Sequence, residues 1–241
     1  MNPRKKLDIS AYFVVGPENT KGRDIAKIIF DVVEAGFTCI QIRSKTASAV
    51  ELIKMTAEAA DAIAQAGKTS QVTLLVDDRL DVVLAALEQG VKVDGIHVGQ
   101  SDIPVSVCRK FLGNDLVIGL TAGTDELARY LETSDVSQID YFGIGPLRQT
   151  FTKPDCGLAP DGKIITKSLD DIKKSAQTSF LPLVVGGGVK LDDIPALART
   201  GVSGFFVVTA VSEADNPKAV AMQMVDAWNA SKAHKSIHLR P

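Results

Sequence analysis

Two basic side chains and an amide stand at alternate positions at the end of a short apolar segment, residues 38–42. They are Gln41, Arg43 and Lys45. Alternate residues of a strand point the same way, so the three groups are expected to converge. An arginine supplies paired hydrogen bonds and a lysine a compact charge, and together they suit a polyanion. Solvated basic residues at an ordinary strand end give the same pattern, so both interpretations stay open at this point.

Carboxylates follow the next two apolar segments, 73–76 and 95–98. Asp77 and Asp78 come directly after the first, and Asp102 lies shortly after the second. Each could simply cap a helix, and for Asp77 and Asp78 taken alone this is the simpler interpretation. Beside a basic cluster the acids could instead bind a cation, because like charges at one rim of the barrel are costly unless a cation lies between them. Carboxylates together with a polyphosphate suit Mg²⁺.

Three consecutive glycines, 186–188, follow the apolar segment 183–185. Glycine lets backbone N–H groups approach a ligand closely, whereas an ordinary tight turn rarely uses three glycines in a row. In eight-stranded α/β barrels the loops after the seventh and eighth strands often bind phosphate. The corresponding loops of this chain carry Gly187, Gly188, Val208 and Thr209. The segment predicts a small-molecule ligand that bears a phosphate.

Hydroxyl groups follow two further apolar segments. Thr121 comes after 116–120, and Thr150 and Thr152 stand beside Lys153 in the connection after 141–144. Hydroxyls and a lysine on a loop suit a phosphate ester or a leaving group, although a loop of solvated threonines has the same appearance. His97 ends another segment and is the only histidine before the C-terminal tail. A buried neutral histidine that packs at a strand end is an equally good interpretation of it.

The elements that must position these residues alternate along the chain. Most of the apolar segments are continuous, which predicts strands buried on both faces, as in a parallel sheet covered by helices. Glycines that favour helix ends close several of the intervening segments. The expected strands are 12–15, 38–42, 73–76, 95–98, 116–120, 141–144, 183–185 and 205–208; the expected helices are 22–35, 47–65, 79–89, 105–111, 125–133, 169–178, 192–200 and 217–230; the terminating glycines are Gly36, Gly67, Gly90, Gly113 and Gly201.

Eight strands that alternate with eight helices, without a break in composition, predict a single (β/α)8 TIM barrel over residues 11–230. Residues 1–10 form an N-terminal extension, and 231–241 form a basic tail that is expected to be disordered. Active sites of such barrels lie at the C-terminal ends of the strands, where all the residues discussed above fall. The long connection 148–167 is expected to be a lid or a binding loop.

Composition narrows the classes of function. The 241 residues carry a net charge of −2, which gives no electrostatic reason to expect nucleic-acid or membrane binding. No apolar segment approaches the roughly 18–20 residues that span a bilayer, and no signal peptide is recognised. The three scattered cysteines, Cys39, Cys108 and Cys156, fit a reducing cytoplasm. A homo-oligomer is compatible with the sequence.

The strand ends, in this order, resemble the thiamine-phosphate synthase (thiamine-phosphate pyrophosphorylase) family. The resemblance spans about residues 12–211 and depends on six motifs in register rather than on one decisive motif. These motifs are Gln41-x-Arg43-x-Lys45, Asp77-Asp78-Arg79, the segment 95–102 with His97 and Asp102, the segment 143–146, Thr150-x-Thr152-Lys153, and Gly187-Gly188.

The resemblance implies an Mg²⁺-assisted dissociative displacement. Diphosphate leaves 4-amino-5-hydroxymethyl-2-methylpyrimidine diphosphate, and 4-methyl-5-(2-hydroxyethyl)thiazole phosphate traps the resulting cation to give thiamine phosphate. It assigns the pyrimidine diphosphate to Gln41, Arg43 and Lys45, and its diphosphate group also to Lys153. It assigns Mg²⁺ to Asp78 and Asp102, and the thiazole phosphate to Thr150 and Thr152. The phosphate cradle is assigned to Gly187, Gly188, Val208 and Thr209, the pyrimidine pocket to Tyr12 and His97, substrate contacts to Asp77 and Thr121, and catalysis to Arg43, Lys45, Thr121 and Lys153.

The chain departs from the family pattern at several of these positions. Asp77 stands where the family usually has asparagine, Thr121 and Thr209 where it has serine, Gly186 where it has an aliphatic residue, and Gly123 where it commonly has histidine. The departures bear on the fit of the substrates more than on the type of reaction.

Three functions other than a synthase are compatible with parts of the sequence. A thiazole tautomerase on the same fold transfers a proton through a histidine after the fifth strand, and here that position is Gly123. A non-catalytic protein that binds thiamine precursors would have no need for both expected Mg²⁺ ligands. A different phosphate-binding isomerase would need an acid–base pair, for which only Asp77 and Asp102 are available at the strand ends.

Overall fold

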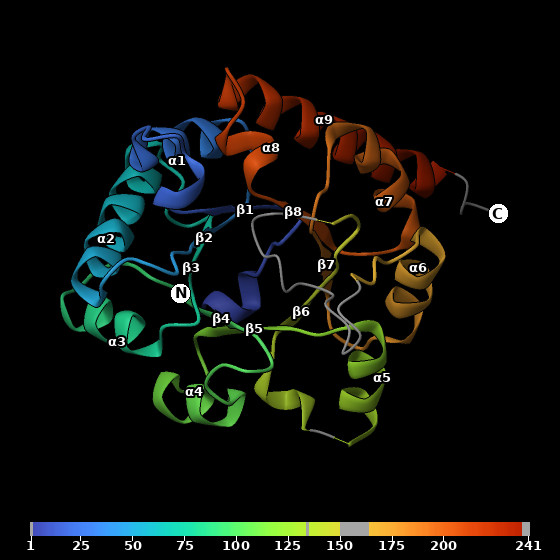
Figure 1. Cartoon of the computed structure of the whole chain (residues 1–241), viewed down its shortest axis with the longest axis horizontal. Helices are drawn as coiled ribbons and strands as arrows, with labels where there is room; N and C mark the ends of the chain where they lie inside the picture. Colours follow the sequence, from blue (N-terminus) through green and yellow to red (C-terminus); the bar gives the residue numbers. More distant parts are fainter. Residues whose placement is uncertain (1, 134, 150–163, 238–241) are drawn as a thin grey trace.

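The eight expected strands close into one parallel barrel. The computed structural model describes residues 2–133, 135–149 and 164–237, and within them each strand pairs with the next and β8 pairs with β1 (Figure 1). The strands are β1 Ala11–Val15, β2 Cys39–Ile42, β3 Thr73–Asp77, β4 Gly95–Val98, β5 Val117–Thr121, β6 Tyr141–Ile144, β7 Leu183–Val185 and β8 Gly204–Val207. The prediction of a single (β/α)8 barrel is confirmed.

Helices surround the barrel on the outside (Figure 1). They are α1 Ile25–Glu34, α2 Ala49–Gln65, α3 Leu80–Glu88, α4 Val105–Leu112, α5 Thr124–Thr133, α6 Leu169–Thr178, α7 Ile194–Thr200, the short α8 Thr209–Ser212 and α9 Pro217–Ile237. All five glycines expected to end helices have a positive φ, between 67° and 103°. No helix in the described part of the chain is long and apolar enough to cross a membrane.

The C-terminal prediction is wrong for residues 231–237. Helix α9 continues past residue 230 to Ile237, so this part of the expected disordered tail is helical. The Lys232 ammonium lies 4.7 Å from the centre of the Trp228 ring and donates to the backbone oxygen of Val202 at 2.7 Å. These contacts hold the helix against the barrel beyond the point at which its apolar pattern fades.

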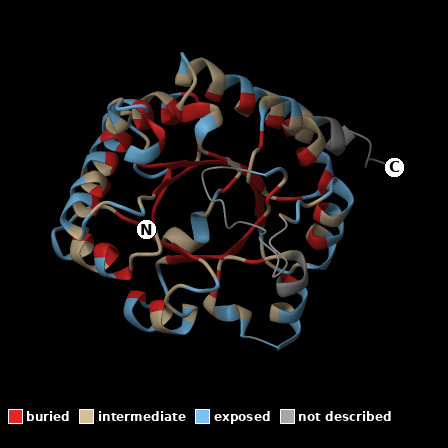
Figure 2. Ribbon diagram, viewed as in Figure 1, coloured by how far each residue is buried: buried red, intermediate tan, exposed pale blue. Residues whose placement is uncertain are grey.

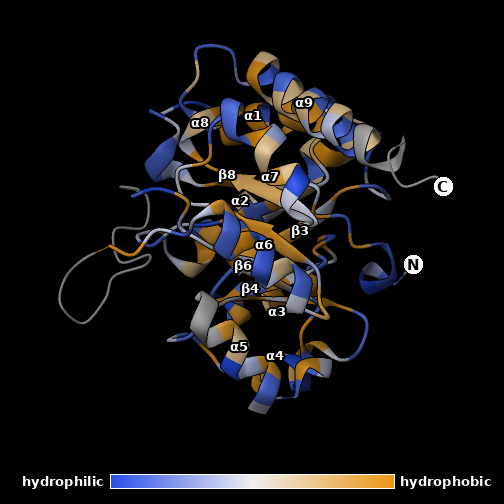
Figure 3. Ribbon diagram, turned by 90° about the vertical axis from the view of Figure 1, so that its right-hand side faces the viewer, coloured by the Kyte–Doolittle hydropathy of each residue, from blue (hydrophilic) through white to orange (hydrophobic). Residues whose placement is uncertain are grey.

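Two apolar clusters lie on the two faces of the barrel wall. The inner cluster fills the barrel and includes Tyr12, Val14, Cys39, Leu75, Val117, Tyr141 and Val184. The outer cluster joins the other face of the strands to the helices, as with Phe13, Ile40 and Leu74. Figure 2 shows the strands buried and the helices exposed on their outer faces, and Figure 3 shows the strands as mainly hydrophobic. Burial on both faces explains why the strand sequences are continuously apolar.

Strand alternation turns polar residues inward at the C-terminal ends of the strands. Gln41 follows Cys39 on the inner face of β2, and Asp77 follows Leu75 on the inner face of β3. The register pairs Gln41 with Leu75, and Asp77 with His97 on β4. The interior of the barrel is therefore apolar at one end, where the inner cluster lies, and polar at the C-terminal ends of the strands.

Candidate active site

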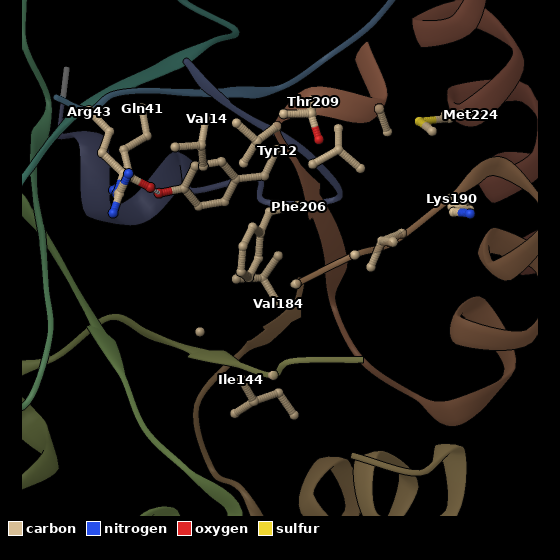
Figure 4. Close-up of a pocket in the computed structure, with 18 of the residues that line it drawn as sticks. Tyr12, Val14, Gln41, Arg43, Ile144, Val184, Lys190, Phe206, Thr209 and Met224 are labelled. Atoms are coloured by element: carbon tan, nitrogen blue, oxygen red, sulfur yellow. Dashed lines mark hydrogen bonds between the residues drawn. The ribbon is translucent and has the colours of Figure 1, made fainter. Parts of the chain in front are cut away.

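A cavity of about 580 Å³ opens at the C-terminal ends of the strands (Figure 4). This volume is in the range of sites that bind organic molecules. The hydroxyl end of Tyr12 lies beside Gln41 and Arg43 in the view of Figure 4. The expected site residues that line the cavity are Tyr12, Gln41, Arg43, Asp77, His97, Thr121, Gly187, Gly188, Val208 and Thr209. Residues from seven different strands or their loops therefore meet at one opening.

Arg43 and Gln41 both hold the Asp77 carboxylate. Arg43 Nε lies 3.1 Å from Asp77 Oδ2, and the Gln41 amide donates to Asp77 Oδ1. Both members of the ion pair are largely buried, with side-chain exposures of 14% for Arg43 and 10% for Asp77. Because an arginine has five donors, Arg43 keeps N–H groups for a ligand after it has bound Asp77.

Lys45 lies at the rim rather than in the cavity wall. Its ammonium donates to Asp78 and lies 4.0 Å from Asp77, and its side chain is half exposed. Glu18 fixes the loop that carries it, since a carboxylate oxygen of Glu18 accepts from the Lys45 backbone N–H at 3.0 Å. The expected cationic cluster thus consists of one largely buried group, Arg43, and one half-exposed group, Lys45, that flank the carboxylates of Asp77 and Asp78.

Asp78 and Asp102 share a hydrogen bond across the ends of β3 and β4. The backbone of Asp78 has a positive φ of 60°, a conformation that costs a residue with a side chain about 1–3 kcal/mol. Burial and the contact with Asp78 raise the pKa of Asp102. Burial acts in the same direction on Asp78, but hydrogen bonds from Lys45 and Asp102 outweigh it and lower the pKa of Asp78.

The pair fits an Mg²⁺ ion that is completed by a substrate. No cluster of three or more histidine, cysteine or acidic side chains suited to a metal occurs in the described residues. Mg²⁺ is commonly bound by one or two carboxylates together with water and phosphate oxygens, so a closed protein cage is not required. Two carboxyl groups held in contact provide such a partial set.

Burial raises the pKa of Asp77 to about 7, and the nearby Asp78 adds to the effect. Arg43 and Lys45 lower the pKa of the same carboxyl group but do not offset its burial. The usual value for this carboxyl group is 3.8. The charged form of Asp77, at a position where the resemblance leads us to expect asparagine, is therefore buried at a cost.

The stability of the wild-type protein relative to Asp77→Asn is expected to fall as the pH rises from about 4 to about 7. In this interval the unfolded chain releases the Asp77 proton while the folded chain retains it, so the unfolded state is favoured. The difference should amount to a few kcal/mol and level off above about pH 7. Urea unfolding of both proteins across this range measures it, and a difference that is independent of pH would contradict the raised pKa.

His97 is buried between two hydroxyl groups. Its Nδ1 lies 2.7 Å from the Tyr141 hydroxyl, and its Nε2 lies 2.7 Å from Thr121 Oγ1. The Tyr141 hydroxyl lies 2.9 Å from the Tyr12 hydroxyl, which donates to Gln41 Oε1 at 2.7 Å. His97 is therefore a packed, hydrogen-bonded residue whose ring also reaches the cavity wall.

The glycine turn after β7 has the backbone conformation that its sequence indicates. Gly187 and Gly188 have φ values of 79° and 76°. A Cβ atom on Gly187 would lie 2.5 Å from Pro146 Cβ, so the turn can pack against the end of β6 only with glycine at this position. Arg148 stabilises the turn by donating to the Gly188 backbone oxygen at 3.2 Å, and it also donates to Asp193 Oδ1 at 2.6 Å.

Because Gly186 has no side chain, the aromatic ring of Phe206 can lie directly against its backbone. A Cβ atom on Gly186 would lie 2.0 Å from Phe206 Cζ, and Phe206 also lines the cavity. The Phe206 ring of β8 therefore occupies the space beside Gly186, a position where the resemblance leads us to expect an aliphatic side chain. The cavity wall keeps its apolar character although the side chain comes from the neighbouring strand.

Gly186→Ala is expected to destabilise the protein by about 1–3 kcal/mol, because the added methyl group overlaps the Phe206 ring. Phe206→Leu withdraws the ring, so the double variant should be more stable than the sum of the two single effects. Urea unfolding of the wild type, the two single variants and the double variant measures the coupling. Strict additivity would show that the two positions do not share this space.

The remaining expected residues are placed as follows. Thr209 begins α8 and is exposed, so its additional methyl group meets no packing restriction. Gly123 lies just before α5, and its backbone oxygen accepts from Leu127 N at 2.7 Å. Thr150, Thr152, Lys153 and Cys156 lie outside the described residues, as does most of the segment 148–167.

Sequence reasoning missed Tyr141, Phe206 and the Arg148–Asp193 pair. The signal for Tyr141 is Gly119, a glycine inside a strand, which indicates a close approach by another group. A Cβ atom on Gly119 would lie 2.2 Å from Tyr141 Cζ. Gly186 is the corresponding signal for Phe206. Nothing local to Arg148 indicates a partner 45 positions away in the sequence.

Comparisons with known proteins agree with this architecture. A family model described as thiamine monophosphate synthase matches residues 11–211. The thiamine-phosphate synthase of Corynebacterium efficiens is 38% identical over 222 residues, which cover 92% of this chain and 96% of that protein. The thiamine-phosphate synthase of Chloroflexus aurantiacus is 35% identical over 218 residues, covering 90% of this chain and 92% of that protein.

A solved structure, the thiamine phosphate pyrophosphorylase from Pyrococcus furiosus, superposes with a TM-score of 0.75 at 23% identity, covering 95% of this chain and 99% of that one. At this identity the superposition supports the fold alone. The family model and the curated sequences carry the assignment, because both span nearly the whole barrel. The chain belongs to the thiamine monophosphate synthase family.

Proposed function

We propose that this chain, a transferase of thiamine biosynthesis, joins its two substrates within the cavity at the C-terminal ends of the strands. The substrates are 4-amino-5-hydroxymethyl-2-methylpyrimidine diphosphate and 4-methyl-5-(2-hydroxyethyl)thiazole phosphate, and the products are thiamine phosphate and diphosphate. One observation carries the proposal: Arg43, Asp77 and the glycine turn after β7 border a single cavity. That cavity thus combines groups suited to a diphosphate with a backbone turn suited to a phosphate.

The diphosphate is assigned to the side of the cavity formed by β2 and β3. Gln41 and Arg43 line this side, and Lys45 lies at its rim. Asp78 and Asp102 would hold Mg²⁺, and the ion, when bound, neutralises charge on the diphosphate. Lys153, which lies outside the described residues, is assigned to the same group because a lysine complements a leaving anion.

The thiazole phosphate is assigned to the opposite side of the cavity. Gly187, Gly188, Val208 and Thr209 line this side, and the two glycines expose backbone to a ligand. Thr150 and Thr152 complete the assignment, although both lie outside the described residues. The pyrimidine ring is assigned to the space between, beside Tyr12, His97 and Thr121.

The proposed reaction is a dissociative displacement. The bond between the pyrimidine methylene carbon and the diphosphate oxygen breaks first, and its electron pair leaves with the oxygen. The thiazole nitrogen then donates its lone pair to the cationic methylene carbon. The task of the protein is to stabilise the charge that develops on the diphosphate, and Arg43 and Lys45 are donors fixed for it. No protein nucleophile is required.

Proton transfer by a residue after β5, as in a thiazole tautomerase, is not favoured. Gly123 occupies that position and has no side chain that could carry a proton. The groups proposed to hold the diphosphate are present as well, and an isomerase of the thiazole would have no use for them.

The proposal is tested by incubating the purified protein with both substrates, with and without Mg²⁺. We expect thiamine phosphate and diphosphate to form in equal amounts, and only when both substrates and Mg²⁺ are present. Binding of the pyrimidine diphosphate without formation of thiamine phosphate would contradict the synthase function. Turnover that is unaffected by chelation of divalent ions would contradict the Mg²⁺ assignment.

We propose a cytoplasmic location for the enzyme. Cys39 and Cys108 are free, buried thiols, and burial raises the pKa of both. Free thiols of this kind are typical of proteins in a reducing compartment.

A further inference from the structure

A chain of hydrogen bonds crosses the interior of the barrel from β3 to β5. Its members come from six strands and meet only because the barrel is closed. In order they are Asp77, Gln41, Tyr12, Tyr141, His97 and Thr121, hereafter the interior chain. Apart from the contact between Gln41 and Asp77, which is shorter, each link joins two atoms 2.7–2.9 Å apart.

Asp77 sets the direction of the first two links. Both of its carboxylate oxygens face donors, with Gln41 at Oδ1 and the Arg43 guanidinium at Oδ2. A guanidinium has no acceptor, so Asp77 Oδ2 accepts from Arg43, and Oδ1 accepts from the Gln41 amide nitrogen. The Gln41 amide therefore turns its NH₂ group to Asp77 and its oxygen to Tyr12. The single proton of the Tyr12 hydroxyl is then committed to Gln41.

The same proton count determines the remaining links. With the Tyr12 proton committed, the contact between the two tyrosines must use the proton of Tyr141. Tyr141 then offers only lone pairs to His97, so His97 Nδ1 must carry a hydrogen. A neutral imidazole has a single N–H, so His97 Nε2 accepts a hydrogen bond from Thr121 Oγ1.

We propose that Tyr141 is a positioning residue, through which the interior chain holds His97 as the neutral imidazole protonated on Nδ1 and makes the Thr121 hydroxyl donate to it. Thr121 then presents lone pairs to the cavity and accepts from a ligand. The ligand group it meets must be a donor, such as the amino group of a heterocycle. Only this identification of the ligand depends on the proposed function; the direction of the interior chain does not.

The strands around the interior chain are built to admit it. A Cβ atom on Gly119 would lie 2.4 Å from the Tyr141 hydroxyl and 2.5 Å from His97 Nδ1, so any other residue there would separate the two groups. Burial raises the pKa of Tyr12 and of Tyr141 well above the usual value, so both keep the proton that the argument requires. Tyr141 is fully buried and does not itself line the cavity, whereas its neighbours Tyr12 and His97 do.

The proton on His97 can be located by nitrogen-15 NMR of the full-length protein, labelled at histidine, without ligand at pH 8. The chain has three histidines, and the loss of signals in His97→Gln identifies those of His97. We expect one directly bonded hydrogen, on Nδ1. A hydrogen on Nε2, or on both nitrogens, would overturn the proposal. Because no substrate is present, this result is independent of whether the proposed reaction occurs.

Three variants then test whether the interior chain is the cause. Tyr12→Phe frees the Tyr141 proton to turn to His97, so the His97 hydrogen should move to Nε2. Thr121→Val leaves the Asp77 end intact, so the hydrogen should stay on Nδ1. Tyr130→Phe makes the same change as Tyr12→Phe at a tyrosine that packs on Phe142, outside the interior chain, and should also leave it on Nδ1. Any of the three giving the opposite result would overturn the proposal.

The variant Tyr141→Phe tests whether the interior chain affects substrate binding and turnover. The variant should move the His97 hydrogen to Nε2, from which it is donated to Thr121. It should also raise the KM for the pyrimidine diphosphate about five- to tenfold, as expected for one hydrogen bond, with a smaller change in kcat. A merely structural role would not couple the tautomer to KM. A moved hydrogen with an unchanged KM would overturn the positioning role of Tyr141.

Discussion

Asp102→Asn is expected to lower kcat about 10³-fold while the protein stays folded. The substitution removes a charge from the pair that is proposed to hold Mg²⁺, and metal stabilisation of a leaving group is worth several kcal/mol. An asparagine oxygen can still accept from the Gly99 backbone N–H, which now donates to Asp102 at 2.8 Å. The local loop should therefore persist, and the loss should be chemical. Steady-state assays across a range of Mg²⁺ concentrations measure the effect.

A matched control is available in the first turn of α3. Asp81 is an exposed acid that pairs with Arg79, close to the site in sequence but not part of the Asp78–Asp102 contact. Asp81→Asn should retain wild-type turnover and wild-type dependence on Mg²⁺. Undiminished kcat in Asp102→Asn, or an equal loss in both variants, would contradict the assignment of Asp102 as a metal ligand.

Arg43→Met is expected to lower kcat/KM about 10²–10³-fold, the usual cost of removing one fixed donor from developing negative charge. It should also lower the free energy of unfolding by about 3 kcal/mol, because Asp77 loses its partner in a largely buried ion pair. The first effect is catalytic and the second structural. Assays and urea unfolding measure the two separately.

The double variant Arg43→Met, Asp77→Asn separates these causes. Removing the unpaired carboxylate should restore most of the stability, because no isolated charge then remains buried. Activity should stay at the level of Arg43→Met, because the group that complements the diphosphate is still missing. Recovery of activity together with stability would show that Arg43 acts by holding Asp77 rather than by binding substrate.

The strand and helix pattern of the sequence was sufficient to predict the fold. Continuous apolar segments indicated strands buried on both faces, and both faces are packed, one by Tyr12 and Val14 and the other by Phe13 and Val15. The helix ends followed from glycines that have a positive φ. Such signals are local, since each depends on a few neighbouring residues. The end of α9 was missed because contacts with Val202, far away in the sequence, extend that helix.

The sequence by itself also determined which side chains stand at the mouth of the barrel, since strand alternation and strand order place Gln41, Arg43, Asp77 and His97 there. Only the tertiary structure decided what these side chains contact. Closing the barrel joins Tyr12 to Tyr141, 129 positions away, and sets Phe206 into the space left by Gly186. It also buries Asp77, which raises its pKa to about 7. Alternation specifies the face on which a residue lies, whereas contacts across the interior depend on side chains from distant strands that fill one shared volume.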